Sequence, residues 1–530
     1  MVDDIKEGGG RRGWSWSTRG SQLNMMQLLG VTLLLWLSVI AKCSSVTITN
    51  PSGVSYVGVR NTTTKQDIFY GIPYAQPPVG PLRFKPPQAW APASNHTLVN
   101  ATANRPVCIQ STPIDDSPVS EDCLYLRKPN NITMKLPVMV WIYGGGFLNG
   151  STLWYPGEAI LNTAFQLGKP VIYVAMNYRL GIYGFPPGKQ SEAAGALNLG
   201  LKDQRLALEW VKKNIGLFGG DVMIFGESAG AMSVAYQMMY KDGKHGGVFR
   251  TALMESGAPS TKFGYVKRSE LQSVQGEARS SYNSTEKILR HPPAPTGPSV
   301  PRSIPVLQNT WPQNYELTSH YGTANLDEGT IFTTNPETTE DVVAFLTAQL
   351  PGLTFGITNK TAVNQLLKYY PAHPSAGSPY NTGNNTFGKA SQYKRAASII
   401  GDLVFDAPRR DFLQVATKLG VSAWSYQWAQ AGLDLPEFGA AHSFDLAFVF
   451  QQRWEGMTQS LIDLSVAMID YWITLAYKLD PGATANPNRA AWPKYGTVGK
   501  SLKLEAGNIT VIGDDFRVGG MNYIQDNLLT

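Results

Sequence analysis

Two uninterrupted apolar runs limit the folds open to this 530-residue chain. They are LPVMVWIY, from Leu136 to Tyr143, and PVIYVAMNY, from Pro170 to Tyr178. Both are rich in Val and Ile and are bounded by Gly or Pro. This pattern is typical of strands buried on both faces of a sheet. The runs therefore predict an α/β protein, in which helices cover a mostly parallel sheet.

Helical patterns follow the two runs. The segment from Leu201 to Ile215 places most of its apolar residues on one face, as an amphipathic helix does. VMIF, at 222–225, then predicts a short strand, and AMSVAYQMMY, from Ala231 to Tyr240, predicts the next helix. Strand, helix, strand and helix in this order favour one large central sheet flanked by helices.

A stretch rich in Pro, Ser and Asn, from Ser280 to Asn314, interrupts this order. Beyond it, sheet-like and helical patterns resume at TIF (330–332), DVVAFLTAQL (341–350) and SAWSYQWA (422–429). We therefore interpret the stretch as a surface excursion within one domain. A linker between two domains is the alternative.

The composition is that of a packed globular protein, with 43% hydrophobic and 16% charged residues. The formal net charge of +6 comes from Lys and Arg residues that are scattered along the chain. Nucleic-acid binding proteins concentrate such charge in a patch or stripe. We therefore expect no nucleic-acid partner.

The N-terminal segment indicates where the protein goes. Leu28 to Ala41 is apolar throughout, too short for a comfortable membrane span and suited to a signal peptide, with Val39 and Ala41 fitting a small-residue cleavage rule. The preceding region is unusually long, so a signal anchor is the alternative, as is translation from Met25 or Met26. We expect a secreted protein without stable membrane insertion after cleavage, with residues 1–43 as N-terminal extension and signal peptide and 44–530 as the enzyme domain.

Sequons and cysteines agree with this compartment. Sequons for N-linked glycosylation occur at Asn61, Asn95, Asn100, Asn131, Asn149, Asn283, Asn359, Asn384 and Asn508. We expect Asn149 to stay unmodified, because it lies close to a loop assigned below to the active site. Of the three cysteines, Cys43 falls near the cleavage site, and Cys108 and Cys123 form the natural bridge in an oxidising environment. No C-x-x-C or H-E-x-x-H is present, so we expect no metal and no cofactor.

The segment FGESAG, 225–230, places a serine between two glycines where a strand turns into a helix. A bare G-x-S-x-G arises by chance, but this context is that of the strained elbow that presents Ser228 as a nucleophile. A Gly-rich turn with a capping serine is the alternative. The glycines Gly144, Gly145 and Gly146, after the first apolar run, can point backbone N–H groups at a tetrahedral oxyanion. A phosphate loop is the rival, but no G-K-[ST] directly follows these glycines.

A serine nucleophile needs a histidine base and an acid. In this architecture the three residues follow one another along the chain in the order serine, acid, histidine. Of six histidines, His442 is favoured because it sits in a small-residue turn, GAAHSF, before an apolar segment. Asp327 and Glu328 both suit the acid, and the pattern does not choose between them. Asp402 and Asp406 are weaker candidates, for which we expect structural roles as helix or turn caps.

These motifs together resemble the type B carboxylesterases, which include cholinesterases and fungal secreted carboxylesterases and lipases. The resemblance spans about residues 47 to 530 and rests on FYGIPYAQPPVGPLRF, SEDCLYL, VWIYGGGF, NYRLGIYGF, LGLKDQRLALEWVKKNIGLFGGD, IFGESAG, ESGAP, DEGTIF and GAAHSFDLAFVF. It implies the α/β-hydrolase fold, with a single catalytic domain and no cofactor.

The resemblance also implies roles for individual residues. The catalytic triad would be Ser228, Glu328 and His442, and the oxyanion donors would be the N–H groups of Gly145, Gly146 and Ala229. Glu227 would be a buried carboxylate beside the nucleophile, and Ser256 a supporting hydrogen-bonding residue. Cys108 and Cys123 resemble the family's first disulfide, and Arg83 and Glu121 its buried ion pair.

Three departures from the family pattern refine the expected function. The interval between Cys108 and Cys123 is short and holds no Trp, the FGGD segment runs directly into VMIF, and the stretch from Gly257 to Glu328 is shortened. We expect a secreted serine carboxylic-ester hydrolase with an open site for small to medium soluble esters, without interfacial activation or cholinesterase activity. The alternatives are a non-catalytic binding or adhesion protein and a lipase acting on acylglycerols.

Overall fold

The computed structural model describes residues 43–50, 52–94, 97–110, 117–130, 136–215, 219–261, 319–350, 353–355, 357, 359–432, 434–483 and 489–529. The signal-like segment and the Pro-rich stretch from Ser280 to Asn314 lie outside the described residues. So do the sequons at Asn95, Asn131 and Asn283 and most of the shortened stretch before Glu328.

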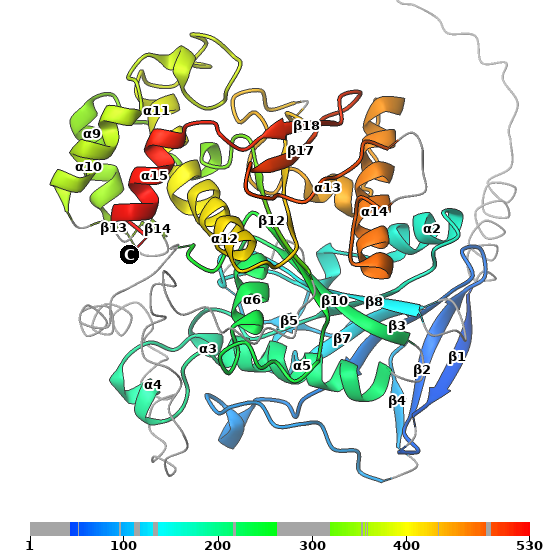
Figure 1. The fold of residues 1–530 in the computed structure, drawn as a ribbon. Helices are drawn as coiled ribbons and strands as arrows, with labels where there is room; N and C mark the ends of the chain where they lie inside the picture. Colours follow the sequence, from blue (N-terminus) through cyan, green and yellow to red (C-terminus); the bar gives the residue numbers. More distant parts are fainter. Residues whose placement is uncertain are drawn as a thin grey trace, which may run out of the picture.

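One large twisted sheet organises the described chain (Figure 1). In spatial order it contains β1 (Cys43–Thr49), β2 (Ser55–Asn61), β3 (Gln66–Pro73), β7 (Tyr125–Asn130), β9 (Ile172–Met176), β8 (Leu136–Ile142), β10 (Gly219–Glu227), β11 (Thr251–Glu255), β12 (Ser319–Asn325), β16 (Tyr426–Trp428), β17 (Lys500–Leu504) and β18 (Thr510–Gly513), with β4 (Leu98–Asn100) on β2 and β15 (Ala423–Trp424) on β12. The pairs from β9 through β17 are parallel, and the pairs along the path from β1 to β9 and at β17 with β18 are antiparallel. The predicted mostly parallel α/β sheet is confirmed.

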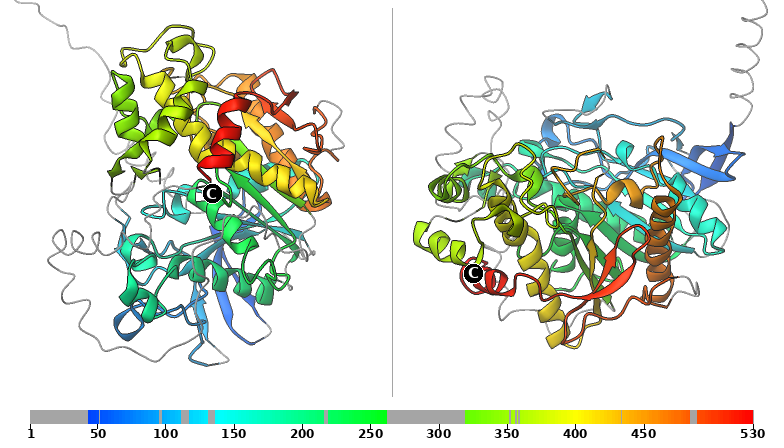
Figure 2. Two further views of the ribbon diagram at one scale, coloured as in Figure 1. Left: turned by 60° about the vertical axis from the view of Figure 1, so that its left-hand side comes forward. Right: turned by 90° about the horizontal axis from the view of Figure 1, so that it is seen from above.

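Helices cover both faces of this sheet (Figure 1). α2 (Glu158–Gln166) and α14 (Gln459–Lys478) lie on one face, and α5 (Leu199–Ile215) and α6 (Ala229–Met238) lie on the other. The remaining α-helices are α3 (Gly181–Gly184), α4 (Lys189–Ala193), α9 (Thr339–Thr347), α10 (Lys360–Leu366), α11 (Tyr393–Gly401), α12 (Ala407–Lys418), α13 (Leu446–Val449) and α15 (Val518–Asn527). Figure 2 shows the C-terminal helix α15 beside α12.

Short strands and turns complete the described elements. The two-stranded sheets are β5 (Val107–Cys108) with β6 (Val119–Ser120), and β13 (Gln349–Leu350) with β14 (Leu353–Thr354). The 3-10 turns are η1 (Gly80–Leu82), η2 (Thr152–Trp154), η3 (Thr330–Phe332), η4 (Leu367–Tyr369) and η5 (Pro374–Ala376), and η6 (Asp402–Asp406) is a π-helical turn.

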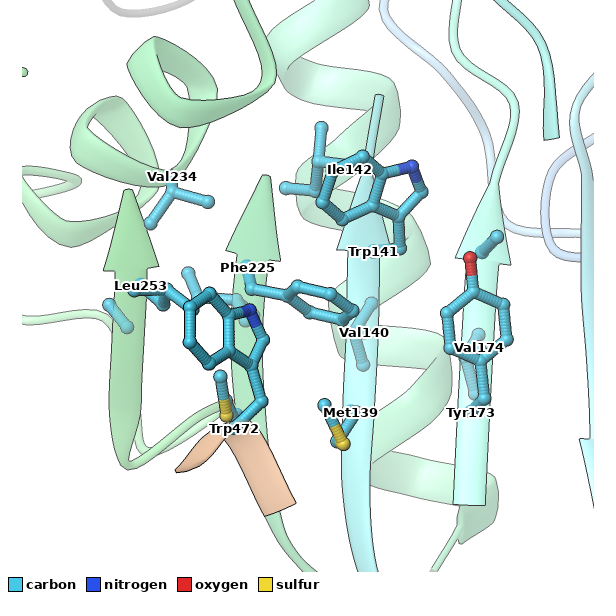
Figure 3. Packing of buried hydrophobic residues seen from close by; sticks show 14 of the residues in the cluster. Met139, Val140, Trp141, Ile142, Tyr173, Val174, Phe225, Val234, Leu253 and Trp472 are labelled. Carbon is cyan, nitrogen blue, oxygen red and sulfur yellow. The ribbon is translucent and has the colours of Figure 1, made fainter. Parts of the chain in front are cut away.

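The two apolar runs form the centre of the core as β8 and β9. Every residue of β9 is buried, and β8 is buried apart from one partly exposed position, Pro137. In Figure 3, Trp141 of β8 and Phe225 of β10 lie next to each other, and their ring centroids are 4.8 Å apart. Trp472 of α14 packs on the same group. A strand buried on both faces has no solvent side, which explains the continuous apolar sequence.

Helix α14 is long and apolar enough to span a membrane by length and composition, with a mean hydropathy of 1.2 over its most apolar window. That window is 72% buried inside the fold, so α14 is a core helix. A second, smaller hydrophobic cluster lies among α9, α10, α11 and α15.

The strand-like prediction for TIF is wrong, because 330–332 form the 3-10 turn η3. The backbone N–H and the hydroxyl of Thr330 both donate to the carbonyl of Asp327, at 3.2 and 2.9 Å. These bonds close a tight turn where a strand would stay extended. The β-branched residues Thr330 and Ile331 therefore lie in a turn here and do not pair as a strand.

The FGGD departure leaves the centre of the sheet intact. The register of β10 against β8 shifts between Gly219 and Val222, then runs unbroken to the pair Gly226 and Ile142. The irregularity is therefore absorbed before the strand reaches the segment that carries the serine.

Candidate active site

The serine elbow has the strained geometry that its glycines predict. Ser228 connects β10 to α6 with φ 57° and ψ −124°, a backbone conformation that L-residues rarely adopt. A Cβ on Gly226 would lie 2.5 Å from the carbonyl oxygen of Ile142, and one on Gly230 only 2.0 Å from it. Only glycine fits at either position. The backbone N–H of Ser228 donates to Glu255 O at 2.9 Å, which fixes the turn to the neighbouring strand β11.

His442 and Glu328 form a short, buried pair. Nδ1 of His442 lies 2.5 Å from Oε2 of Glu328, and the two side chains are 4% and 0% exposed. Because a carboxylate only accepts, Nδ1 carries the proton and Nε2 of a neutral ring is left as an acceptor. Oε1 of Glu328 accepts the backbone N–H of Asn325 at 2.6 Å, so both carboxylate oxygens are held.

The ring of His442 packs against two aromatic residues rather than among small neighbours alone. The ring centroids of Phe332 and Phe405 lie 5.0 and 4.5 Å from it. The small residues Ala440 and Ala441 that precede the histidine are themselves buried. Packing and the bond to Glu328 together fix the orientation of the imidazole.

Asp327 has a different task from its neighbour. Its Oδ1 accepts from Ser378 Oγ and Tyr380 N, at 2.7 and 2.9 Å, and its Oδ2 accepts from Ala440 N at 2.9 Å. These bonds hold the backbone just before His442 and occupy the carboxylate fully. Of the two adjacent acids that the pattern left open, the structure places Glu328 on the imidazole.

Asp402 and Asp406 are structural, as expected, but they are not caps. Asp402 accepts from Arg517 and from the hydroxyl of Tyr370, the latter at 2.7 Å, and Asp406 pairs with Arg409 at 3.2 Å. Neither side chain caps a helix. Both lie inside the π-helical turn η6, where the partly exposed Arg517 and the buried Arg409 balance their charge.

Glu227 approaches the other nitrogen of the imidazole. Its Oε1 lies 3.2 Å from Nε2 of His442 and accepts the hydroxyl of Ser443 at 2.5 Å. Ser443 itself has φ 67°, so its backbone is held in the left-handed region. Sequence reasoning missed Ser443, for which the only signal is its position directly after His442.

Two further buried acids, Asp445 and Glu255, interact electrostatically with the carboxylates around His442, and sequence reasoning missed both. Asp445 accepts from the hydroxyl of Tyr426 at 2.9 Å and from Nδ2 of Asn325 at 3.2 Å. Glu255 accepts from Nε1 of Trp472 at 2.8 Å. Burial raises the pKa of Asp445 to about 6, and the negative charge of Glu328 adds to this. Burial and the charge of Asp445 likewise raise the pKa of Glu255.

The electric field of the carboxylates favours a positive imidazole. Burial alone lowers the pKa of His442, but the charges of Glu227 and Glu328 outweigh it and raise that pKa to about 9. Burial raises the pKa of Glu227 to about 7, although the charge of His442 opposes this shift. The site is therefore prepared to stabilise an imidazolium, the species that a histidine base becomes when it accepts a proton.

The glycine-rich loop lies directly against the elbow. A Cβ on Gly144 would come within 2.8 Å of Oε2 of Glu227 and 3.0 Å of Cβ of Ser228. Gly145 and Gly146 have φ values of +93° and +61°. Ala229, the third expected donor, is the first residue of α6 and is buried. The structure thus brings the loop, the elbow and the start of α6 together.

Ser256 is buried at the end of β11, with φ 55°. Its backbone N–H donates to Thr323 O at 3.0 Å. Its hydroxyl has no hydrogen-bond partner within the described ranges. The supporting role of Ser256 therefore stays a prediction.

The expected disulfide is present between Cys108 and Cys123. Arg83 and Glu121 pair through two hydrogen bonds of 2.6 Å, but their side chains are 34% and 16% exposed. The expectation of a buried ion pair is wrong, because both side chains are partly exposed to solvent. Among the residues that the structure describes, no group of three His, Cys, Asp or Glu side chains is arranged to hold a metal.

Comparisons with known proteins agree with this architecture. A model of the carboxylesterase family matches residues 53–289. Secreted triacylglycerol lipase LIP1 of Gibberella zeae is 34% identical over 559 residues, which cover 92% of this chain and 91% of that protein. Lipase 2 of Geotrichum candidum is 32% identical, over 88% of this chain and 92% of that protein. The crystal structure of Aspergillus niger EstA superposes with a TM-score of 0.72 at 26% identity, over 90% of this chain and 98% of that one.

Proposed function

Because this chain belongs to the carboxylesterase family and is a carboxylic-ester hydrolase, we propose that it cleaves small to medium soluble esters through an acyl-enzyme on Ser228. The observation that carries the proposal is the buried contact of 2.5 Å between Glu328 and Nδ1 of His442. It leaves Nε2 of a neutral imidazole to take a proton. The strained elbow at Ser228 supports the assignment of the nucleophile.

In the first half-reaction, Oγ of Ser228 attacks the ester carbonyl and its proton passes to Nε2 of His442. The N–H groups of Gly145, Gly146 and Ala229 bind the oxygen that becomes negative. The tetrahedral intermediate collapses as its bond to the alcohol oxygen breaks, and the imidazolium donates the proton to that oxygen. The alcohol leaves, and the acyl group remains on Ser228.

In the second half-reaction, water attacks the acyl carbonyl while His442 takes one of its protons. The same N–H groups bind the second oxyanion. The bond to Oγ of Ser228 then breaks, the proton returns to that oxygen, and the carboxylic acid departs. Glu328 and Glu227 stabilise the imidazolium in both halves, because each places a carboxylate oxygen near one ring nitrogen.

Two features support the substrate class and the location. The short interval between Cys108 and Cys123 leaves little chain for a lid over the site. Two of the similar proteins are named as secreted lipases. An extracellular enzyme agrees with the signal-like segment before β1 and with the disulfide. The catalytic unit would span 44–530. Removal of residues 1–43 is compatible with the fold, because it takes only one residue, Cys43, from the edge strand β1.

A lipase acting on acylglycerols is the second candidate. It is favoured by the names of the similar proteins from Gibberella zeae, Botryotinia fuckeliana and Geotrichum candidum. Hydrolysis of tributyrin below and above its solubility limit separates the two. A soluble-ester hydrolase follows simple saturation, whereas a sharp rise in rate when droplets form would assign the lipase function.

The primary test is hydrolysis of p-nitrophenyl acetate, butyrate and palmitate by the secreted protein. We expect turnover of the short esters, a fall towards palmitate, and loss of activity in Ser228→Ala. Ser52→Ala, at an exposed serine, is the matched control and should equal the wild type. Folded wild-type protein with no turnover and no labelling by a serine-directed fluorophosphonate would instead favour a binding or adhesion protein.

A further inference from the structure

Gln110 makes a reciprocal contact with the far end of the glycine-rich loop. Its Oε1 accepts the backbone N–H of Gly150 at 3.0 Å, and its Nε2 donates to the carbonyl of Gly150 at 3.1 Å. The same Nε2 also donates to the carbonyl of Cys108 at 3.1 Å. One carboxamide therefore joins the loop to the strand β5, which the Cys108–Cys123 disulfide anchors.

The loop that Gln110 holds is the one that bears the expected oxyanion donors. It begins at Tyr143, whose ring stacks on Tyr178 with centroids 4.5 Å apart and whose carbonyl accepts the Tyr178 hydroxyl at 2.8 Å. It ends at Gly150, where a Cβ would lie 2.3 Å from the Tyr143 ring. Tyr178 therefore fixes the start of the loop, and Gln110 fixes its end.

Between these ends the backbone depends on its surroundings. Gly145, Gly146 and Phe147 follow one another with φ values of +93°, +61° and +62°. Glycine adopts such φ values readily, but at Phe147 this conformation costs energy and persists only where neighbouring groups hold it. The carbonyl of Gly145 accepts from the N–H groups of Leu148 and Asn149, at 3.0 and 3.1 Å. The orientation of the peptides at Gly145 and Gly146 is thus coupled to the position of the chain at Gly150.

We propose that Gln110 is a positioning residue that orients the N–H groups of Gly145 and Gly146 toward the oxyanion. The inference rests on the proposed function. Oxyanion donors work because they are fixed before the charge develops, so a loop that can rotate its peptides loses transition-state binding. Substrate binding in the ground state makes less use of these donors. Loss of Gln110 should therefore reduce kcat far more than it changes KM.

The test compares Gln110→Met with Gln190→Met. Methionine keeps the approximate volume of glutamine but makes no such hydrogen bonds, and Gln190 is an exposed glutamine in α4. For Gln110→Met we expect kcat on p-nitrophenyl butyrate to fall about 10- to 100-fold, a part of the effect of removing a donor outright. KM should stay within about twofold, while Gln190→Met should match the wild type.

A transition-state analogue distinguishes a positioning role from a merely structural one, because a structural role would leave the inhibition constant of the analogue unchanged. An alkyl trifluoromethyl ketone adds to the serine and forms an oxyanion, so its inhibition constant should rise in parallel with the loss in kcat/KM. An unchanged inhibition constant, or a lower melting temperature with unchanged kcat, would overturn the proposal. If Gln110→Met is not secreted, Gln110→Glu is measured for the same split, since it still accepts from Gly150 N–H but no longer donates.

This experiment separates two failures. Wild-type protein without turnover contradicts the proposed function. Active wild type with an equally active Gln110→Met variant contradicts only the role of Gln110.

Discussion

Glu227 Oε1 lies 3.2 Å from Nε2 of His442, on the opposite side of the imidazole from Glu328. In the proposed mechanism Nε2 takes the proton of Ser228, so the charge of Glu227 would act on that transfer. The charges of Glu227 and Glu328 raise the pKa of His442 to about 9, against the lowering by burial. A base works only in its neutral form, so the rising limb of kcat/KM against pH should have its midpoint near that value.

Glu227→Gln should move this limb to lower pH. Removing a negative charge near Nε2 destabilises the imidazolium, which lowers the pKa of His442. The same loss of charge weakens stabilisation of the imidazolium during the reaction, so kcat at its plateau should fall. Profiles of kcat/KM for both proteins on p-nitrophenyl acetate, from pH 5 to 10, measure the shift. If the midpoint of the rising limb does not shift, Glu227 does not influence the pKa of His442.

The contrast between adjacent acids gives a second prediction. Glu328→Gln should lower kcat by roughly 10³- to 10⁴-fold, by analogy with loss of the acid in other serine triads, because the amide no longer stabilises the imidazolium. Asp327→Asn should instead lower the free energy of unfolding, since Asp327 binds backbone N–H groups at Tyr380 and Ala440. Kinetics and urea unfolding on both variants distinguish the roles. Equal kinetic losses would contradict the assignment.

Asp514 provides a prediction on stability. It accepts from Arg409 and Arg410 at 2.8 and 3.0 Å, and all three side chains are buried. Burial opposes ionisation of Asp514, but the charge of Arg409 and its hydrogen bonds outweigh burial and lower the pKa to about 2. Asp514→Asn removes the carboxylate that these two buried guanidinium groups share and leaves Arg409 with only Asp406, at 3.2 Å. It should cost about 3–5 kcal/mol of unfolding free energy.

The exposed neighbour Asp515 offers the matched control, since Asp515→Asn should change stability by no more than ~0.5 kcal/mol. The sign of the pH dependence follows from the lowered pKa. Asp514 contributes stability above the unfolded pKa of about 3.9, and this contribution is lost as pH falls towards about 2. Urea midpoints between pH 2 and 6 should therefore converge for wild type and Asp514→Asn at the acid end. A gap that persists there would contradict the ionic explanation.

The disulfide supplies a fourth prediction. Cys108 and Cys123 are separated by 15 positions, and a loop of that size is worth ~3 kcal/mol in the chain-entropy treatment. The double variant Cys108→Ser, Cys123→Ser should lose about that much stability. It should also lose part of kcat, because the Cys108 carbonyl helps to hold Gln110. If the double variant keeps full kcat while its stability falls, the disulfide does not act on the glycine-rich loop.

The elements that could be predicted most reliably from the sequence are those whose residue pattern has only one structural explanation. The continuous apolar runs could only be strands with two buried faces, and they are β8 and β9. TIF failed because Thr330 bonds back to Asp327, a local contact that periodicity does not register. The pattern left the choice between Asp327 and Glu328 open for a similar reason. It depends on where the backbone at Ala440 arrives, more than a hundred residues later.

Side chains that act through the backbone of another segment were invisible to motif reasoning. Gln110, two residues after β5, reaches the backbone of Gly150 only by folding, and Ser443 likewise reaches the side chain of Glu227 only by folding. Asp445 and Glu255 were missed because buried acids carry no periodic signal. The glycines at 226 and 230 were readable, since no other residue fits against the carbonyl of Ile142.

The order of the site residues along the chain has a consequence for the newly made protein. The elbow is formed by β10 and α6, whereas Glu328 and His442 belong to the later part of the chain, where His442 follows Glu328 by 114 positions. During synthesis on the ribosome, Ser228 therefore emerges long before His442, its proposed base. In the proposed mechanism, Ser228 has no base to take its proton until the chain has been made past His442. Under the proposed mechanism, a product terminated before residue 442 therefore lacks the base and cannot form the acyl-enzyme.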